Sequence, residues 1–283
     1  MTIAGLKTDF EKELKGLYSS IEIKNIFYYV LSHLLEVSKL TILSHTDKEI
    51  DENLLKNIGP IVLKLKKMMP VQYVLGKADF YDMVLDVNPS VLIPRPETEE
   101  LADWIIKENM GKNVSILDVC TGSGCIALAL KKNLLHSHLK AIDFSAKALE
   151  VAKANAKKYK LNIDFMEADA LKLDQFLGPN EFDIIVSNPP YVTPDEKETM
   201  HDNVMLYEPH EALFVPGNDP LIFYKAIAEF AKESKKTTML YFEINESKGD
   251  ELTVLFKNMG LTDIIVKKDI NGKDRMLKCT YLC

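Results

Sequence analysis

The sequence predicts an α/β protein: a doubly wound, mostly parallel sheet with a C-terminal antiparallel hairpin, preceded by a small all-helical domain. Three observations predict it. Apolar residues recur at three- and four-residue steps before residue 70, short apolar runs alternate with helical patterns after residue 93, and Asn271-Gly272 separates two apolar runs near the end. We therefore expect a helical domain over 1–70, a linker over 71–92 and a sheet domain over 93–283.

The first 70 residues have the pattern of amphipathic helices. Such spacing places apolar side chains on one helix face, which packs against a neighbour. No catalytic or metal-binding pattern occurs here, so we expect a domain that holds a partner or braces the rest. The two apolar stripes consist of Ile23, Ile26, Phe27, Val30, Leu31 and Leu34, and of Leu54, Ile58, Ile61, Val62 and Leu65.

The period changes after Pro70. Aromatic and β-branched residues follow, and they are broken at Gly76 and Asn88-Pro89. These features are typical of extended segments separated by turns. We expect a strand pair, a β-hairpin linker between two domains.

After Pro94 strands alternate with helices, which is the pattern of a parallel sheet with right-handed crossovers. Asn-Gly between two apolar runs is a strong hairpin signal, so we expect the sheet to end in an antiparallel pair. A helix is expected over 126–135. The expected strands are 115–119, 139–143, 163–167, 182–187 and 238–244, followed by a hairpin of 263–269 and 276–282.

Composition limits the function classes. The 283 residues are 47% hydrophobic and 27% charged, with a formal charge of −7, as in ordinary globular proteins. No run of ~18 apolar residues or secretory signal occurs, and an acidic chain is a poor match for duplex DNA. We expect a cytoplasmic monomer that binds neither membranes nor, stably, nucleic acid. The cysteines fit no disulfide framework or metal site; they are Cys120, Cys125, Cys279 and Cys283.

A candidate cofactor site follows the first predicted strand. Gly122 and Gly124 allow a tight turn close to a ligand, and the next helix would point its amides there. Asp143, 19 residues beyond Gly124, ends the second strand, where a carboxylate can accept ribose hydroxyls. Asp169 follows the third strand and is equally well explained as a helix cap. The alternative is a glycine turn without a ligand, which explains the two glycines but explains Asp143 less well.

This motif by itself fits more than one nucleoside cofactor. Gly122-x-Gly124-x-x-Ala127 followed by an acid also satisfies the dinucleotide fingerprint. Asp118 before the glycines and the antiparallel end of the sheet favour S-adenosylmethionine over NAD.

A candidate substrate site follows the fourth strand, at Asn188-Pro189-Pro190-Tyr191. The prolines end the strand and stiffen the chain where ligands of such sheets bind. Asn188 Oδ1 and the Pro189 carbonyl could accept both N–H groups of an amide, which would weaken its delocalisation, while Tyr191 stacks on it. The amide nitrogen would then face a sulfonium methyl at ~3–3.5 Å. The alternative is a strand-ending turn without chemistry.

Other functions explain fewer of these features. A DNA adenine-N6 methyltransferase also acts on a planar nitrogen, but it must extract a base and normally has a basic recognition region. An NAD-dependent dehydrogenase leaves the Pro-Pro turn without a role. A non-enzymatic adaptor leaves Asp143 and Asn188 without one.

The motifs together resemble those of the release-factor glutamine N5-methyltransferases, a class I S-adenosylmethionine-dependent family with an Asn-Pro-Pro-Tyr motif. The resemblance extends from about residue 70 to the end. It implies transfer of a methyl group to the glutamine of the Gly-Gly-Gln loop of peptide-chain release factors, with the N-terminal helices gripping the factor. Besides Asn188 to Tyr191, it is carried by segments 70–76, 80–81, 91–99, 118–127 and 142–149.

The resemblance also implies site residues. Asn188 would contact both cofactor and substrate, and Asn188, Pro189, Pro190 and Tyr191 would bind the glutamine. Arg95, in Pro94-Arg95-Pro96-Glu97, either pairs with an acid as a brace or lines the active site. The implied cofactor-binding residues are Thr121, Gly122, Ser123, Gly124, Cys125, Asp143 and the backbone near Ala170.

Overall fold

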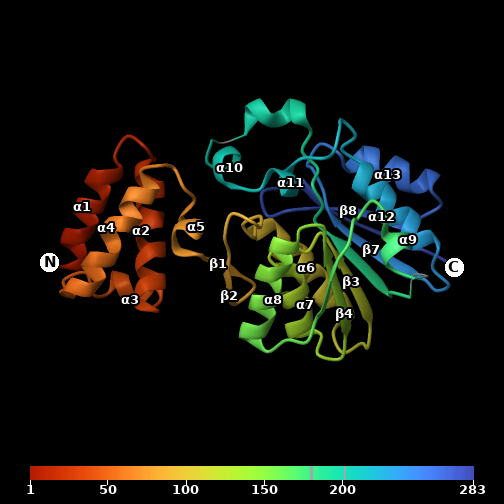
Figure 1. Ribbon diagram of the computed structural model, residues 1–283, viewed down its shortest axis with the longest axis horizontal. Helices are drawn as coiled ribbons and strands as arrows, with labels where there is room; N and C mark the ends of the chain where they lie inside the picture. Colours follow the sequence, from red (N-terminus) through yellow and green to blue (C-terminus); the bar gives the residue numbers. More distant parts are fainter. Residues whose placement is uncertain (179–180, 201) are drawn as a thin grey trace. The chain divides into compact units, whose positions relative to one another are not determined.

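The computed structural model describes residues 1–178, 181–200 and 202–283, which form two compact units (Figure 1). The first, called here the helical unit, comprises residues 1–77 with 202–207. The second, the sheet unit, comprises the remaining described residues up to Cys283. Among the described residues, no helix is long and apolar enough to cross a membrane.

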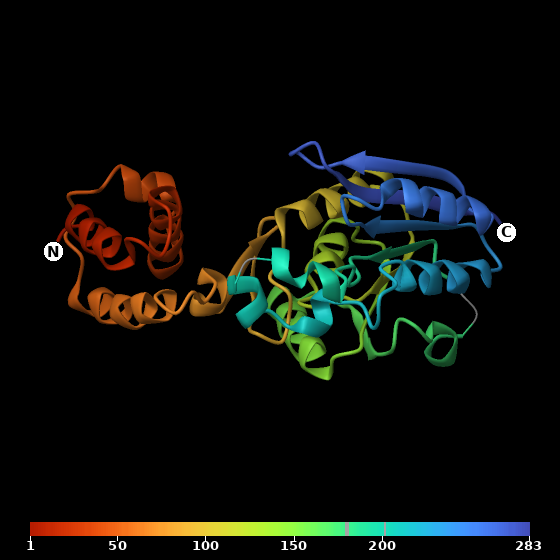
Figure 2. The ribbon, with the colours of Figure 1, turned by 90° about the horizontal axis from the view of Figure 1, so that it is seen from above.

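The helical unit contains no strand between residues 1 and 76, which are the red and orange part of the ribbon (Figure 2). Phe27, Leu31 and Leu65 are fully buried at its centre, and burial of this kind provides most of the stability of short helices. Ser19 and Glu22 form a capping box at the start of α2. The helices are α1 (Ile3–Leu14), α2 (Ser20–Leu35), α3 (Lys39–Leu43), α4 (Glu52–Leu65), α5 (Val71–Leu75) and α10 (Asp202–Tyr207).

Helix α5 corrects one expectation. Val71–Leu75 is helical, not extended, and Gly76 ends it in the left-handed conformation with its N–H donated to the Gln72 carbonyl. Tyr73 and Val74 are buried. The predicted strand pair begins only afterwards, as β1 (Lys77–Phe80) and β2 (Met83–Asp86).

Besides the β1-β2 pair, the described residues of the sheet unit form a larger sheet of seven strands in the order β5-β4-β3-β6-β7-β9-β8. The first five are parallel, and β9 runs antiparallel to both neighbours. The chain moves outward from β3 to β4 and β5, then returns to β6 on the other side of β3. This reversal leaves a crevice at the carboxyl ends of β3 and β6, where ligands of open α/β sheets bind. The strands are β3 (Ser115–Val119), β4 (His138–Asp143), β5 (Asp164–Glu167), β6 (Ile184–Ser187), β7 (Thr238–Glu243), β8 (Thr262–Lys268) and β9 (Asp274–Tyr281).

Helices cover both faces of this sheet (Figure 1). Alternate strand residues serve the two faces: Leu117 packs in one apolar cluster and Ile116 in the other. The first face carries α9 (Leu173–Phe176), α12 (Ile222–Lys232) and α13 (Gly249–Asn258); the second carries α6 (Pro96–Asn109), α7 (Cys125–Asn133) and α8 (Ala146–Tyr159). The 3₁₀ helix η1 (Pro194–Thr199) and α11 (His210–Leu213) belong to the connection after β6. The predicted doubly wound α/β fold is confirmed.

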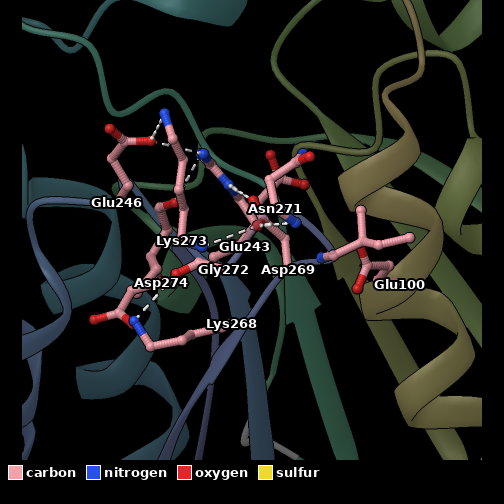
Figure 3. Close-up of polar contacts among 12 residues, drawn as sticks. Glu100, Glu243, Glu246, Lys268, Asp269, Asn271, Gly272, Lys273 and Asp274 are labelled. Atoms are coloured by element: carbon pink, nitrogen blue, oxygen red, sulfur yellow. Dashed lines mark hydrogen bonds and ion pairs between the residues drawn. The ribbon is translucent and has the colours of Figure 1, made fainter.

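The predicted hairpin is confirmed, with a longer turn than a two-residue Asn-Gly loop. The Asp269 N–H donates to the Lys273 carbonyl at 2.8 Å, and Gly272 has a φ of +80°. The Asp269 carboxylate accepts from the backbone N–H groups of Asn271 and Lys273 at 2.9 and 3.0 Å and from Arg275 Nε at 3.3 Å (Figure 3). These bonds fix the start of β9, the strand that Arg275 occupies.

Candidate functional site

A cavity of about 430 Å³ lies in the sheet unit, a size within the ~300–1,000 Å³ typical of small-molecule sites. Its walls come from residues 90–95, the turn after β3, the ends of β4 and β5, and the loop after β6. The cavity therefore lies at the crevice where the strand order reverses. Of the residues expected to bind a cofactor or substrate, those that line it are Thr121, Gly122, Ser123, Cys125, Asp143, Asp169, Ala170, Asn188 and Pro190.

The turn from β3 into α7 forms one wall. The Thr121 N–H donates to the Ile142 carbonyl at 2.9 Å, and the Gly122 N–H donates to Asp143 Oδ2 at 2.8 Å. Gly122 has a φ of +55°, a conformation that glycine adopts without steric cost. Ser123 Oγ is buried and has no hydrogen-bond partner within the described part of the chain. This wall consequently offers an unpartnered hydroxyl group beside the half-buried Gly122.

Gly122 and Gly124 have different structural roles in this turn. A Cβ at Gly122 would meet nothing within 4 Å, whereas a Cβ at Gly124 would lie 2.6 Å from Leu128 Cδ1 and 3.1 Å from Ala152 Cβ. Gly124 is not among the cavity-lining residues. It allows the start of α7 to pack closely against α8.

Asp143 connects the glycine turn to the second strand. Its Oδ1 accepts from the Ser145 N–H at 2.9 Å, in addition to the bond from Gly122. Burial raises the pKa of Asp143, and these backbone N–H groups oppose that rise. An ionised carboxylate has about four acceptor positions, so Asp143 keeps acceptor capacity for ligand hydroxyls.

Asp169 lines the cavity while it also supports its own loop. Its Oδ1 accepts from the Leu171 N–H at 2.9 Å, and its Oδ2 pairs with Lys172 Nζ at 3.3 Å. The helix-cap alternative is wrong, because α9 begins at Leu173 with Lys172 as its N-cap residue and has no side-chain cap. The cavity location of Asp169 is what the structure shows. Ala170, beside it, is buried at the cavity wall.

Asp118 is fully buried under the turn and does not line the cavity. Thr121 Oγ1 donates to its Oδ2 at 2.6 Å. Desolvation raises the pKa of Asp118 to about 7, against the Thr121 hydrogen bond. Burial likewise raises the pKa of Cys125 to about 12, which keeps this cavity-lining thiol neutral.

The Asn-Pro-Pro-Tyr corner leaves β6 at the same edge of the sheet. Ser187 Oγ donates to the Val119 carbonyl at 2.7 Å, which ties the end of β6 to the end of β3. Asn188 and Pro190 line the cavity, whereas Pro189 and Tyr191 do not. The Tyr191 hydroxyl instead lies 3.5 Å from Glu243 Oε1, and burial raises its pKa, so it stays protonated.

Behind Asn188 lies a chain of hydrogen bonds that extends to β7. Asn188 Nδ2 donates to Thr98 Oγ1 at 3.3 Å, and Thr98 Oγ1 donates to Glu243 Oε2 at 2.6 Å. Thr98 and Glu243 are 2% and 3% exposed. Desolvation raises the pKa of Glu243 to about 7, while the Thr98 hydrogen bond and the nearby Arg275 charge oppose the rise.

Arg95 satisfies both interpretations given to it. Its Nη2 pairs with Glu208 Oε1 at 2.5 Å, and Glu208 Oε2 accepts the Ile93 N–H at 3.2 Å. The Glu208 side chain is almost fully buried. Arg95 also lines the cavity, so the ion pair holds residues 93–95 in the cavity wall.

Sequence reasoning missed several residues of this region. Phe144 lines the cavity although it is 70% exposed, and an aromatic residue after a strand-ending acid was a usable signal. Glu243, an acid at the end of an apolar strand, was another. Thr98 carried no such signal, because its partners are 90 and 145 residues away in the sequence.

Comparisons with known proteins agree with this architecture. Residues 98–228 match the family described as methyltransferase small domain, and residues 8–76 match the PrmC N-terminal domain. The catalytic domain of hMettl16 in complex with MAT2A 3′UTR hairpin 1 has a TM-score of 0.55 at 16% identity, covering 80% of each chain. At that identity the likeness shows the fold alone.

Two curated relatives match nearly the whole chain. The release factor glutamine methyltransferase of Flavobacterium psychrophilum is 42% identical over 99% of this chain and 100% of its own. That of Bacteroides thetaiotaomicron is 40% identical over 94% of this chain and 95% of its own. With identity at this level over both units, the chain belongs to the release factor glutamine methyltransferase family.

Proposed function

We propose that this chain transfers the methyl group of S-adenosylmethionine to the side-chain N5 of the glutamine in the Gly-Gly-Gln loop of peptide-chain release factors. One observation carries the proposal: a single cavity borders the glycine turn, Asp143 and Asn188. A nucleoside cofactor on the turn would therefore share one enclosed space with an amide held at Asn188.

The residues of the cavity fit S-adenosylmethionine. Asp143 retains acceptor positions for ribose hydroxyls, and Ser123 Oγ is buried at the wall without a partner in the described residues. Phe144 offers an exposed ring to a flat base. Thr121, Gly122, Cys125, Asp169 and Ala170 complete the proposed binding site. When bound, the cofactor supplies a methyl group already activated by its positively charged sulfur.

The protein's contribution is to hold and orient the amide. An amide nitrogen is a poor nucleophile because its lone pair is delocalised into the carbonyl. Asn188 Oδ1 and the Pro189 carbonyl accept its two N–H groups in our proposal, which weakens this delocalisation as the nitrogen attacks. Pro190 and Tyr191 complete the substrate corner, and the largely apolar wall of Val91, Ile93 and Phe214 keeps water away.

The two units have different proposed roles. We propose that the N-terminal helices, residues 1–70, recognise the release factor, that 71–92 link them to the rest, and that 93–283 catalyse the transfer. Neither membrane nor stable nucleic-acid binding enters this scheme, and the chain acts as a cytoplasmic monomer. A formal charge of −7 supports the absence of a phosphate-binding surface.

Mass spectrometry of a release factor incubated with the chain and S-adenosylmethionine tests the proposal. The factor should gain the mass of one methyl group, located on the glutamine of its Gly-Gly-Gln loop. Asn188→Ala should abolish transfer while calorimetry shows cofactor binding largely kept. An unmodified factor beside methylated DNA would overturn the proposal in favour of a DNA adenine methyltransferase.

A further inference from the structure

Glu243 is a buried carboxylate whose partners are hydroxyl groups. Thr98 Oγ1 donates to its Oε2 and the Tyr191 hydroxyl to its Oε1, and within the described part of the chain it forms no ion pair. Arg275, the nearby cation on β9, is engaged by Asp269 and Glu246 (Figure 3). Burying an unpaired carboxylate is costly, so a carboxylate in this position calls for an explanation beyond packing.

When Glu243 is ionised, the hydrogen bonds that start from it have one possible direction. An ionised carboxylate only accepts hydrogen bonds, so the one hydroxyl proton of Thr98 is committed to Glu243. Thr98 Oγ1 can then only accept from Asn188, which must turn its Nδ2 toward Thr98. Asn188 Oδ1 is left as an acceptor, and among the described residues nothing donates to it.

We propose that Glu243, acting through Thr98, fixes the amide orientation of Asn188 so that its oxygen is available to the amide N–H of the substrate. Both are positioning residues for methyl transfer. The inference rests on the proposed function, because an acceptor is needed only if the substrate presents an N–H donor. Without Glu243 the Thr98 hydroxyl can donate to Asn188 Oδ1. The Asn188 amide can then be rotated so that its Nδ2, a donor, meets the N–H of the substrate, which is also a donor.

The protonation state of Glu243 makes this orientation sensitive to pH. Burial raises the pKa of Glu243 to about 7, so the carboxylate gains a proton in mildly acidic solution. Protonated Glu243 can donate to Thr98 and reverse the chain. Other titratable and charged groups also face Glu243. They are Arg95 just before α6, Glu97 in α6, Arg275 on β9, Tyr191 after β6, Tyr224 on α12 and Cys125 on α7.

Three variants of the full chain test the inference with a release factor as substrate. Thr98→Val removes the hydroxyl and should lower kcat about 10–100-fold, with little change in cofactor affinity by calorimetry, as for other losses of an orienting partner. Thr98→Ser keeps the hydroxyl and should restore kcat to within about threefold of wild type. Glu243→Gln can donate to Thr98 and should lower kcat as Thr98→Val does.

Matched controls are Thr238→Val and Glu108→Gln. Thr238 is a buried threonine at the opposite end of β7, bonded to the Phe182 carbonyl, and Glu108 is an acid of α6 bonded to Tyr241. Neither lines the cavity, so both should retain the kcat of wild type. The wild-type kcat should fall as pH drops through about 7, whereas Glu243→Gln should show no such step.

A readout independent of activity separates this inference from the proposed function. In protein labelled with ¹⁵N-asparagine, the side-chain NH₂ signals of Asn188, assigned by their loss in Asn188→Ala, should shift in Thr98→Val and in Glu243→Gln. Unchanged signals, or a Thr98→Val enzyme with the kcat of wild type, would overturn the inference. A wild-type chain that leaves the release factor unmodified would overturn the proposed function alone.

Discussion

Replacing Gly124 by alanine should destabilise the sheet unit far more than the same change at Gly122. Gly124 has a φ of +81°, and the left-handed conformation costs a non-glycine residue roughly 1–2 kcal/mol. The new Cβ would also lie 2.6 Å from Cδ1 of the fully buried Leu128 and 3.1 Å from Ala152 Cβ. Such overpacking costs typically about 1–3 kcal/mol. The two contributions sum to about 2–5 kcal/mol in the free energy of unfolding.

Gly122→Ala is the matched control. Gly122 shares the positive φ, but its Cβ would meet nothing within 4 Å, so only the conformational cost of roughly 1–2 kcal/mol remains. Urea unfolding followed by tryptophan fluorescence isolates the sheet unit, because the one tryptophan of the chain, Trp104, is buried there against Tyr241. Equal losses in the two variants, or a larger loss in Gly122→Ala, would refute the packing role of Gly124.

Three further changes test other parts of the sheet unit. Phe144→Ala should weaken S-adenosylmethionine binding by about 1–3 kcal/mol through lost stacking on the base, measured by calorimetry; Phe176→Ala, also exposed but outside the cavity, should not. Asn155→Ala should lower the unfolding free energy by about 2–4 kcal/mol, because it leaves the Asp86 N–H and the Ser123 carbonyl without their buried partner; a loss of about 0.5 kcal/mol or less would contradict this. The raised pKa of Asp118, about 7, means that the folded state binds more protons than the unfolded state between pH ~4 and ~7. Stability should therefore fall as pH rises through that window, by up to ~1.4 kcal/mol per pH unit from this group; Asp118→Asn should flatten the slope in urea titrations, and an unchanged slope would refute the assignment.

Local patterns were sufficient to predict much of the fold. The apolar runs of β3, β4 and β6 alternate with amphipathic helices, and Asn271-Gly272 marks the hairpin of β8 and β9. These signals depend on neighbours a few residues apart, which a sequence displays directly. Val71–Leu75 was misassigned because five residues are too few to show a helical period, and the Gly76 cap that ends α5 looks like any glycine turn.

The candidate site was predictable only where it followed from strand ends. In a parallel sheet the carboxyl ends of neighbouring strands meet at one edge, so Asp143 after β4 and Asn188 after β6 could be assigned to the same crevice. The same rule selects Glu243, the last residue of β7. The rule does not, however, predict that the Glu243 side chain contacts Thr98 of α6, because the position of α6 depends on how the helix packs against the sheet.

Residues that orient another side chain, without contacting the substrate themselves, are the hardest part of a site to predict from sequence. Thr98 and Glu243 are separated by 145 residues, and the sequence does not show that their side chains are in contact. Their meaning comes from hydrogen-bond direction: one proton between a carboxylate and a hydroxyl decides which atom of Asn188 remains for a ligand. That decision requires three groups within bonding distance at once, and only the folded chain brings them together. A motif identifies the residue that contacts the substrate, whereas the residues that orient it are identified by following its hydrogen bonds outward.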